Sequence, residues 1–190
     1  MISAESFIQA FFEVIEKEQD NLDAKLGRVD KNRNRTELYT EYMMDTVLYA
    51  IAEKLDCRYE KEKYKLDAVF YPKKENNNRY FHVAIEHENY GGHAHEELEK
   101  LSLFNVPLKV LITYLYYDED NVDSFLKQWS DSVIFEMDYF KDFAYKRRHL
   151  LIIGRRNPYE TMENQSEIHR INPAWTSYIW NGKDFVVFPK

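Results

Sequence analysis

The sequence predicts an α/β fold in which a mixed β-sheet is flanked by helices and followed by a C-terminal β-hairpin. Three patterns support this prediction. Apolar side chains in residues 3–17 recur at helical spacing. Residues 108–117 form an apolar run rich in β-forming residues, which is typical of a strand buried on both faces. Asn181 and Gly182, a strong signal for a hairpin turn, lie between two β-type segments.

The other elements follow from apolar periodicity and from turn residues along the chain. Helices are expected at 3–17, 36–55, 93–104 and 121–132. Strands are expected at 58–71 (two strands or one long bent strand), 80–88, 108–117, 133–135 and 150–153, with hairpin arms at 175–180 and 184–188. Gly154 is expected to end its strand. Because no repeat or linker divides the chain, we predict one domain over 1–190, with a core at 36–117 and a C-terminal extension carrying the hairpin 175–188.

Composition narrows the class of protein. The chain has 190 residues, 44% hydrophobic and 31% charged, which is typical of a globular protein. The net charge of −7 argues against a general nucleic-acid coat or a binder of anionic membranes. The single cysteine, Cys57, cannot form an internal disulfide and is expected to be buried. The longest apolar runs, about six residues, are too short to span a membrane, and no signal peptide is recognisable, so we expect a cytoplasmic protein.

The most informative residues are three carboxylates. Glu86 and Glu88 close a strand that is otherwise apolar, and strand alternation places both on one face with His87 on the other. If Asp67 lies on the adjoining strand, the three acids converge. Crowded carboxylates repel one another unless a cation or a proton relieves them. Oxygen donors with open water positions suit Mg²⁺ or Mn²⁺. The alternative is an exposed strand face with solvated acids.

A helix supplies a further acid. One stripe of the helix expected at 36–55 consists of Glu37, Glu41, Met44, Leu48, Ile51 and Leu55. Because the apolar part of this stripe should face the sheet, Glu37 and Glu41 are expected to continue it. Glu37 is the preferred site residue and Glu41 the alternative. Both could instead be ordinary first-turn acids favoured by the helix dipole.

This order of residues resembles the PD-(D/E)xK nuclease superfamily, whose members have the restriction-endonuclease-like fold. In that family a helix bearing Glu precedes a hairpin bearing Asp; a strand with Glu-x-Lys, a helix and an apolar strand follow. Residues 36–117 match this order, with Asp67 and Glu86 at the acidic positions. The resemblance implies a metal-dependent nuclease that hydrolyses phosphodiester bonds in nucleic acid, with DNA favoured over RNA. It implies that Asp67, Glu86 and Glu88 bind Mg²⁺ or Mn²⁺, and that Glu37 completes the catalytic set.

The sequence departs from the family pattern at one position, where Glu88 replaces the usual lysine. Glu88 could help to bind a second ion or act on the attacking water, as in the minority of members with Glu-x-Glu. A lysine could also reach the site from elsewhere, and Lys100 and Lys65 are the candidates. The departure supports an alternative function, namely a catalytically inactive nuclease-fold protein that binds nucleic acid or a protein partner. A structural or regulatory subunit is a third reading.

Further residues are expected to contact the substrate. Basic residues gather at 31–35, 146–148 and 155–156. Arg33, Arg35, Lys100 and His93 are the candidates for binding nucleic acid. The neighbouring His95 also raises a zinc site as an alternative, which is disfavoured because no HExxH motif is present. A homodimer is a further expectation, since many enzymes of this family cut both strands as dimers.

Overall fold

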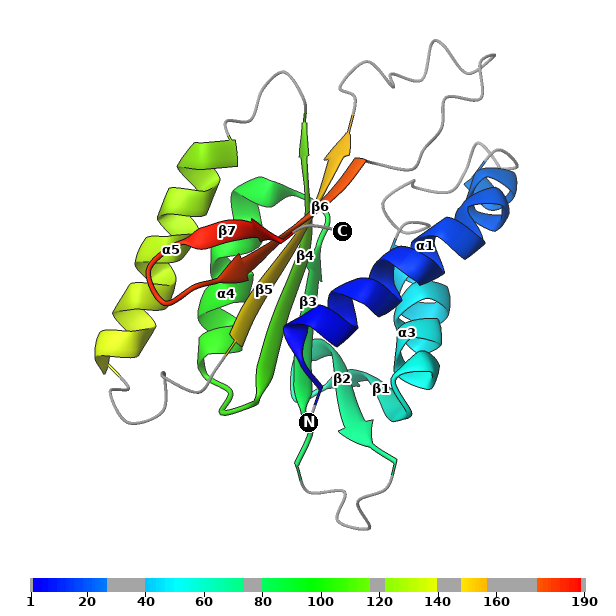
Figure 1. The fold of residues 1–190 in the computed structure, drawn as a ribbon, viewed down its shortest axis with the longest axis horizontal. Helices are drawn as coiled ribbons and strands as arrows, with labels where there is room; N and C mark the ends of the chain where they lie inside the picture. Colours follow the sequence, from blue (N-terminus) through cyan, green and yellow to red (C-terminus); the bar gives the residue numbers. More distant parts are fainter. Residues whose placement is uncertain are drawn as a thin grey trace.

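The computed structural model describes residues 2–26, 40–73, 80–116, 122–139, 148–156 and 174–188. In these residues seven strands form one mixed sheet. Helices cover both of its faces (Figure 1). The predicted α/β class and mixed sheet are therefore confirmed.

The helical elements overlap the four predicted helices, but their bounds differ. They are α1 (Ala4–Leu26), the π-helical segment η1 (Met43–Leu48), α3 (Tyr49–Lys54), the 3₁₀ turn η2 (Gly91–His93), α4 (Ala94–Ser102) and α5 (Val122–Tyr139). The strands are β1 (Cys57–Lys63), β2 (Leu66–Pro72), β3 (Val83–Glu88), β4 (Leu108–Tyr116), β5 (Arg148–Arg156), β6 (Ala174–Trp180) and β7 (Phe185–Phe188). The segment expected at 58–71 is thus two strands.

The strands lie in the sheet in their order along the chain, from β1 to β7. The first three are antiparallel, and β3, β4 and β5 are parallel to one another. The last two add antiparallel pairs at the far edge. Parallel neighbours require a crossover, and α4 and α5 lie in the two crossover connections.

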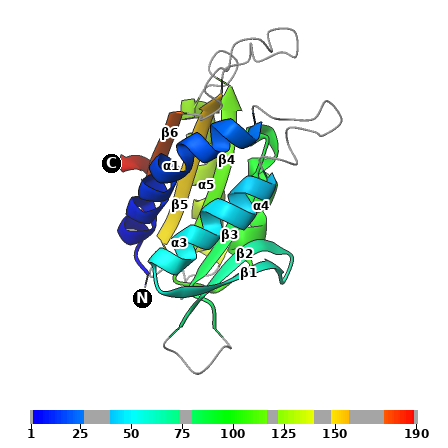
Figure 2. The same ribbon diagram turned by 90° about the vertical axis from the view of Figure 1, so that its right-hand side faces the viewer.

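Two apolar clusters fill the spaces between the sheet and the helices. On one face α1 and α3 pack on the sheet (Figures 1 and 2). There Phe7 stacks on Phe70, and Phe11 lies edge-on to Trp175. On the other face α4 and α5 cover the sheet, where the fully buried Trp129 lies. Residues of one parallel strand therefore alternate between two cores, which explains why 108–117 is apolar throughout.

The second helix corrects one sequence expectation. Its stretch from Met43 to Leu48 is π-helical, and the buried residues from Tyr42 onward are Tyr42, Met43, Met44, Val47, Leu48, Ile51 and Ala52. The wider turn shifts the apolar stripe, so a regular helical period does not extend it back to Glu41, which is exposed. The expectation that Glu41 continues the buried stripe is wrong. Glu37 lies outside the described residues.

One predicted strand and one predicted strand end are also wrong. Residues 133–135 are not a strand, because α5 continues through them to Tyr139 and buries Val133 one turn after Trp129. Gly154 does not end β5, since it pairs with Trp175 and the strand continues to Arg156. In both places a tertiary partner overrides a local signal.

The C-terminal hairpin is confirmed. Its arms, β6 and β7, are joined by the four residues Asn181–Asp184, and Gly182 takes the positive φ of 103° that glycine tolerates best. The Asn181 side-chain oxygen accepts the backbone N–H groups of Lys183 and Asp184 at 2.8 and 2.9 Å, which closes the loop. Among the described helices none has the length and apolar character needed to cross a bilayer.

Candidate active site

Asp67 and Glu86 face each other across the antiparallel pair β2–β3. They stand one step beyond the paired residues Ala68 and Ile85. The backbone N–H of His87 donates to Asp67 Oδ2 at 2.8 Å, and the backbone N–H of Asp67 donates to Glu86 Oε2 at 3.4 Å. The structure therefore brings these two predicted acids together, each held by the backbone of the other's strand.

Alternation along β3 sorts its polar residues as predicted. Glu86 is completely buried and contacts a side chain of α4. His87 points to the opposite face, where its Nε2 lies 3.0 Å from the hydroxyl of Tyr114. The acid pair thus belongs to the face covered by α4 and α5, and His87 belongs to the core beneath α1 and α3.

A lysine from α4 reaches the acid pair. Lys100 Nζ lies 3.0 Å from Glu86 Oε1 and 2.6 Å from Glu97 Oε2. The exposed fraction of the Lys100 side chain is 32%, that of Glu97 is 22% and that of Glu86 is zero. Of the two candidate lysines, Lys100 contacts the site. Lys65 occupies the exposed β1–β2 turn.

The electrostatics of Glu86 are dominated by its burial. Burial raises the pKa of Glu86 to about 9, the neighbouring charge of Asp67 adds to the rise, and the hydrogen bond from Lys100 opposes it. For Lys100, burial lowers the pKa, but hydrogen bonds to Glu97 and Glu86 together outweigh it and raise the pKa. Without a further cation, Glu86 therefore holds a proton near neutral pH while Lys100 stays charged.

Glu88 lies on the same strand but takes part in a local turn. Its Oε1 accepts the backbone N–H of Tyr90 at 2.8 Å. Its neighbour on β4 is Thr113, which is fully buried and whose Oγ1 has no hydrogen-bond partner in the described part of the chain. In the described residues no three His, Cys, Asp or Glu side chains are arranged to hold a metal. The convergence of Asp67, Glu86 and Glu88 on one cation stays a prediction.

The first described turn of the second helix lies beside this end of β3. Asn89 Nδ2 donates to Thr40 Oγ1 at 2.7 Å, so the first described turn of that helix is tied to the residue that follows Glu88. Glu41 lies near Lys61: Asp45 is the main cause of the raised Lys61 pKa, and Glu41 contributes to it. Glu37, Arg33 and Arg35 fall outside the described residues, so their predicted roles stay predictions.

The histidines after β3 have local contacts. His93 is exposed and lies edge-on to the ring of Tyr90. His95 Nδ1 lies 3.1 Å from the carbonyl oxygen of Gly92. This geometry leaves His93 accessible at the start of α4, as a substrate contact would require.

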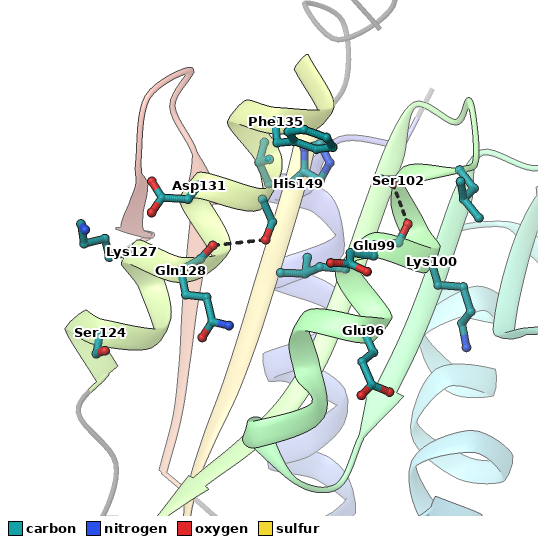
Figure 3. Close-up of a pocket in the computed structure, with 14 residues that line it drawn as sticks. Glu96, Glu99, Lys100, Ser102, Ser124, Lys127, Gln128, Asp131, Phe135 and His149 are labelled. Atoms are coloured by element: carbon teal, nitrogen blue, oxygen red, sulfur yellow. Dashed lines mark hydrogen bonds between the residues drawn. The ribbon is translucent and has the colours of Figure 1, made fainter. Parts of the chain in front are cut away.

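A separate pocket of about 1030 Å³ lies between α4 and α5. Its lining includes Glu96 and Glu99 of α4, Ser124, Gln128 and Phe135 of α5, and His149 of β5 (Figure 3). Lys100 lies at its border, but its amine extends away from α5, and neither Asp67 nor Glu86 lines the pocket. The pocket and the acid pair are therefore different features of the same face.

Two partners in the site were missed by sequence reasoning. Glu97 is one helical turn before Lys100, and this i,i+3 spacing could have indicated that the two side chains meet. Thr113 gave no signal, because one threonine inside an apolar strand is unremarkable until its strand is placed beside β3.

Comparisons with known proteins place few limits on this chain. No protein-family model matches it, and no curated protein is a significant match. Among solved structures, it is similar to the central domain of yeast acetyl-CoA carboxylase, with 9% sequence identity and a TM-score of 0.41. The match covers 95% of this chain and 34% of that one, so the chain spans about a third of its length. A likeness this weak does not bear on fold family or function.

Proposed function

We propose that this protein is a metal-dependent nuclease of the restriction-endonuclease-like fold, which hydrolyses phosphodiester bonds in nucleic acid, with DNA favoured over RNA. The order of elements supports the proposal. A helix precedes three antiparallel strands, and α4 then leads to the parallel strand β4. This is the order that the sequence resemblance implies, with Asp67 on the second of the three strands and Glu86 on the third.

The observation that carries the proposal is the contact of Lys100 with Glu86 at 3.0 Å. The sequence lacks a lysine two residues after Glu86. In the fold, a lysine from the crossover helix approaches the same carboxylate from the layer above the sheet. A cation is therefore available beside the acid pair even though Glu88 stands at the usual position.

The residues present fit a divalent cation. Asp67 and Glu86 supply carboxylate oxygens from adjacent strands, and Thr113 Oγ1, a buried oxygen without a partner in the described chain, lies on the next strand. A cation bound near Glu86, in addition to Lys100, would also favour the ionised form that burial opposes. Mg²⁺ or Mn²⁺, when bound by Asp67 and Glu86, would lower the pKa of water and offset negative charge at the phosphate.

The remaining side chains would position the substrate and stabilise the charge that develops on it. Lys100, kept charged by Glu97, would orient the attacking water or face the negative charge that develops on the phosphate. Glu88 accepts a backbone N–H in the turn that follows β3 and would shape the approach to the site. His93, exposed at the start of α4, would contact the substrate.

A cleavage assay tests this proposal. Purified protein should nick plasmid or cut single-stranded DNA with Mn²⁺, and EDTA should abolish the activity. Asp67→Asn and Lys100→Met should each lower the rate at least tenfold, about 1.4 kcal/mol in barrier. Lys127→Met, which alters an exposed lysine of α5 on the same face, is the matched control and should cleave like wild type. Equal rates for Lys100→Met and Lys127→Met would remove Lys100 from the mechanism.

One observation favours a second function. Lys100 already contacts Glu86 Oε1, and Glu88 accepts the backbone N–H of Tyr90, which suits an inactive nuclease-fold protein that binds nucleic acid or a protein partner. Binding that survives Asp67→Asn, with no cleavage of any DNA or RNA by wild type, would favour that function. Glu88→Lys restores the common family pattern and should retain cleavage if the lysine acts as a generic cation.

A further inference from the structure

The turn between β1 and β2 is built from residues that strain it. Lys63 pairs with Leu66, so Tyr64 and Lys65 are the two central residues of a tight hairpin turn. Their φ angles are 58° and 67°, and Glu62, just before the turn, has a φ of 53°. Hairpin turns with positive φ at both central positions strongly favour Asn-Gly, because side chains of other residues crowd the backbone there. Strained backbone of this kind gathers at functional sites, so the presence of Tyr and Lys here calls for a reason.

The ring of Tyr64 is exposed yet firmly supported. It is 57% exposed and stacks on Phe81, with centroids 5.9 Å apart and planes 21° apart. Phe81 in turn contacts the rings of Tyr71 and Phe104. The cluster therefore holds the flat ring of Tyr64 at the protein surface.

Cations accompany this surface. The Lys63 amine lies 5.4 Å from the centroid of the Tyr64 ring, and it also contacts Glu60 at 3.3 Å. Lys65 is exposed at the tip of the turn. Exposed aromatic rings interleaved with cations are the combination by which proteins bind single-stranded nucleic acid, through base stacking and phosphate contact.

The turn is also close in the chain to residues of the candidate active site. Tyr64 is three residues before Asp67, and Phe104, which supports Phe81, is four residues after Lys100. We infer that the β1–β2 turn binds single-stranded nucleic acid, with a base stacked on Tyr64 and the backbone phosphates contacted by Lys65 and Lys63. A single protruding ring needs a base with a free face, which a stacked duplex does not offer. The inference rests on the proposed function in one respect only: the bound single-stranded nucleic acid would be the substrate of the Asp67–Glu86 site.

Binding measured in EDTA, where cleavage is suppressed, tests the inference. The probe is a fluorescent oligothymidylate of about 20 nucleotides, a length that covers an ordinary single-strand site. Its affinity is compared with that of the matching DNA duplex and of an oligouridylate. Fluorescence anisotropy should show tighter binding of the single strands. Tyr64→Leu should bind at least about fivefold more weakly, and Tyr64→Phe, which keeps the ring, should bind like wild type. Tyr49→Leu, which alters a tyrosine of similar exposure on α3, is the control and should also bind like wild type.

A second variant separates binding from folding. Asparagine tolerates positive φ better than lysine does, so Lys65→Asn should leave the Tm unchanged or raise it. It should nevertheless weaken binding and reduce the slope of log affinity against log salt by about one, as expected for a lost phosphate contact. Equal binding by wild type and both turn variants, or binding of duplex as tight as of single strands, would overturn the inference.

The binding measurement does not depend on catalysis. Asp67→Asn should still bind oligothymidylate at least as tightly as wild type, because the turn is intact and one negative charge near the nucleic acid is removed. If wild type binds through Tyr64 but cuts nothing, the proposed nuclease function fails and the inference stands. If wild type cuts DNA and the turn variants bind and cut equally well, the inference fails and the nuclease function stands.

Discussion

The replacement of Glu86 by Gln should reveal the proton that burial places on this carboxyl. The pKa of Glu86 rises from 4.5 to about 9 on folding, chiefly through burial. A group with a raised folded pKa costs nothing below pH 4.5, where both states are protonated. As pH rises, the unfolded chain loses the proton first, so stability falls until the folded group ionises near pH 9. By pH 7 the accumulated cost is about 3 kcal/mol, at about 1.4 kcal/mol for each pH unit.

Glu86→Gln removes this cost but also alters the contact with Lys100. We therefore expect the free energy of unfolding at pH 7, without metal, to rise by about 1–3 kcal/mol, and the Tm by several degrees. Between about pH 5.5 and 8.5 the free energy of unfolding of Glu86→Gln should fall less steeply with pH than that of wild type, by about 1.4 kcal/mol for each pH unit. Urea unfolding followed by tryptophan fluorescence at several pH values, in EDTA, measures both quantities.

The control is Glu96→Gln, an exposed acid of α4, which should leave the slope of the wild type unchanged. Added Mn²⁺ should stabilise wild type more than Glu86→Gln, since a ligand stabilises the state that binds it. Parallel pH profiles for wild type and Glu86→Gln would show that Glu86 is ionised throughout, and the reasoning about its burial would be refuted.

Three further outcomes follow from single residues. Cys57 is buried, and burial raises the pKa of its thiol to about 11, so it should resist Ellman's reagent at pH 8 until urea unfolds the chain; rapid reaction of native protein would contradict this. Gly91→Ala should lower the free energy of unfolding by about 1–3 kcal/mol, because the new methyl group would collide with the Leu115 side chain and lie 2.9 Å from the Tyr114 carbonyl oxygen. Gly182→Ala should cost only about 1–2 kcal/mol, since nothing lies within 4 Å and only the positive φ is strained; urea unfolding ranks the two, and the opposite order would refute the collision.

The elements that could be predicted are those whose signal is contained in a short segment. The apolar run at 108–117 identifies a strand between two cores, and Asn181 with Gly182 identifies a hairpin. The nearness of Asp67 and Glu86 was expected on the condition that their strands adjoin, and β2 and β3 do form an antiparallel pair. Each of these depends on residues that are near one another in the chain.

The elements that could not be predicted depend on distant partners. The π-helical turn at Met43–Leu48 changes the helical period, and the sequence pattern assumes a constant one. Tyr59, from β1, donates its hydroxyl to the Met44 carbonyl within that segment at 2.8 Å, a contact across the core that no local pattern encodes. Val133 has high β-propensity, but Trp129 and the sheet beneath α5 bury it as a helical residue.

The position of Lys100 shows how a lysine can reach Glu86 although the chain has none two residues after it. A lysine two residues after Glu86 would share its face of β3 and approach from within the sheet. The helix α4 returns over that same face, so a long side chain from its last turn reaches the buried carboxylate from above. Glu97, one turn earlier, balances the charge of Lys100 and fixes its direction. Because Lys100 approaches from the helix layer, Glu88 is left to accept the Tyr90 N–H and shape the turn that begins the crossover. The arrangement of cation and carboxylate therefore follows from the β3–α4 crossover, and a search confined to positions 86–88 could not have found it.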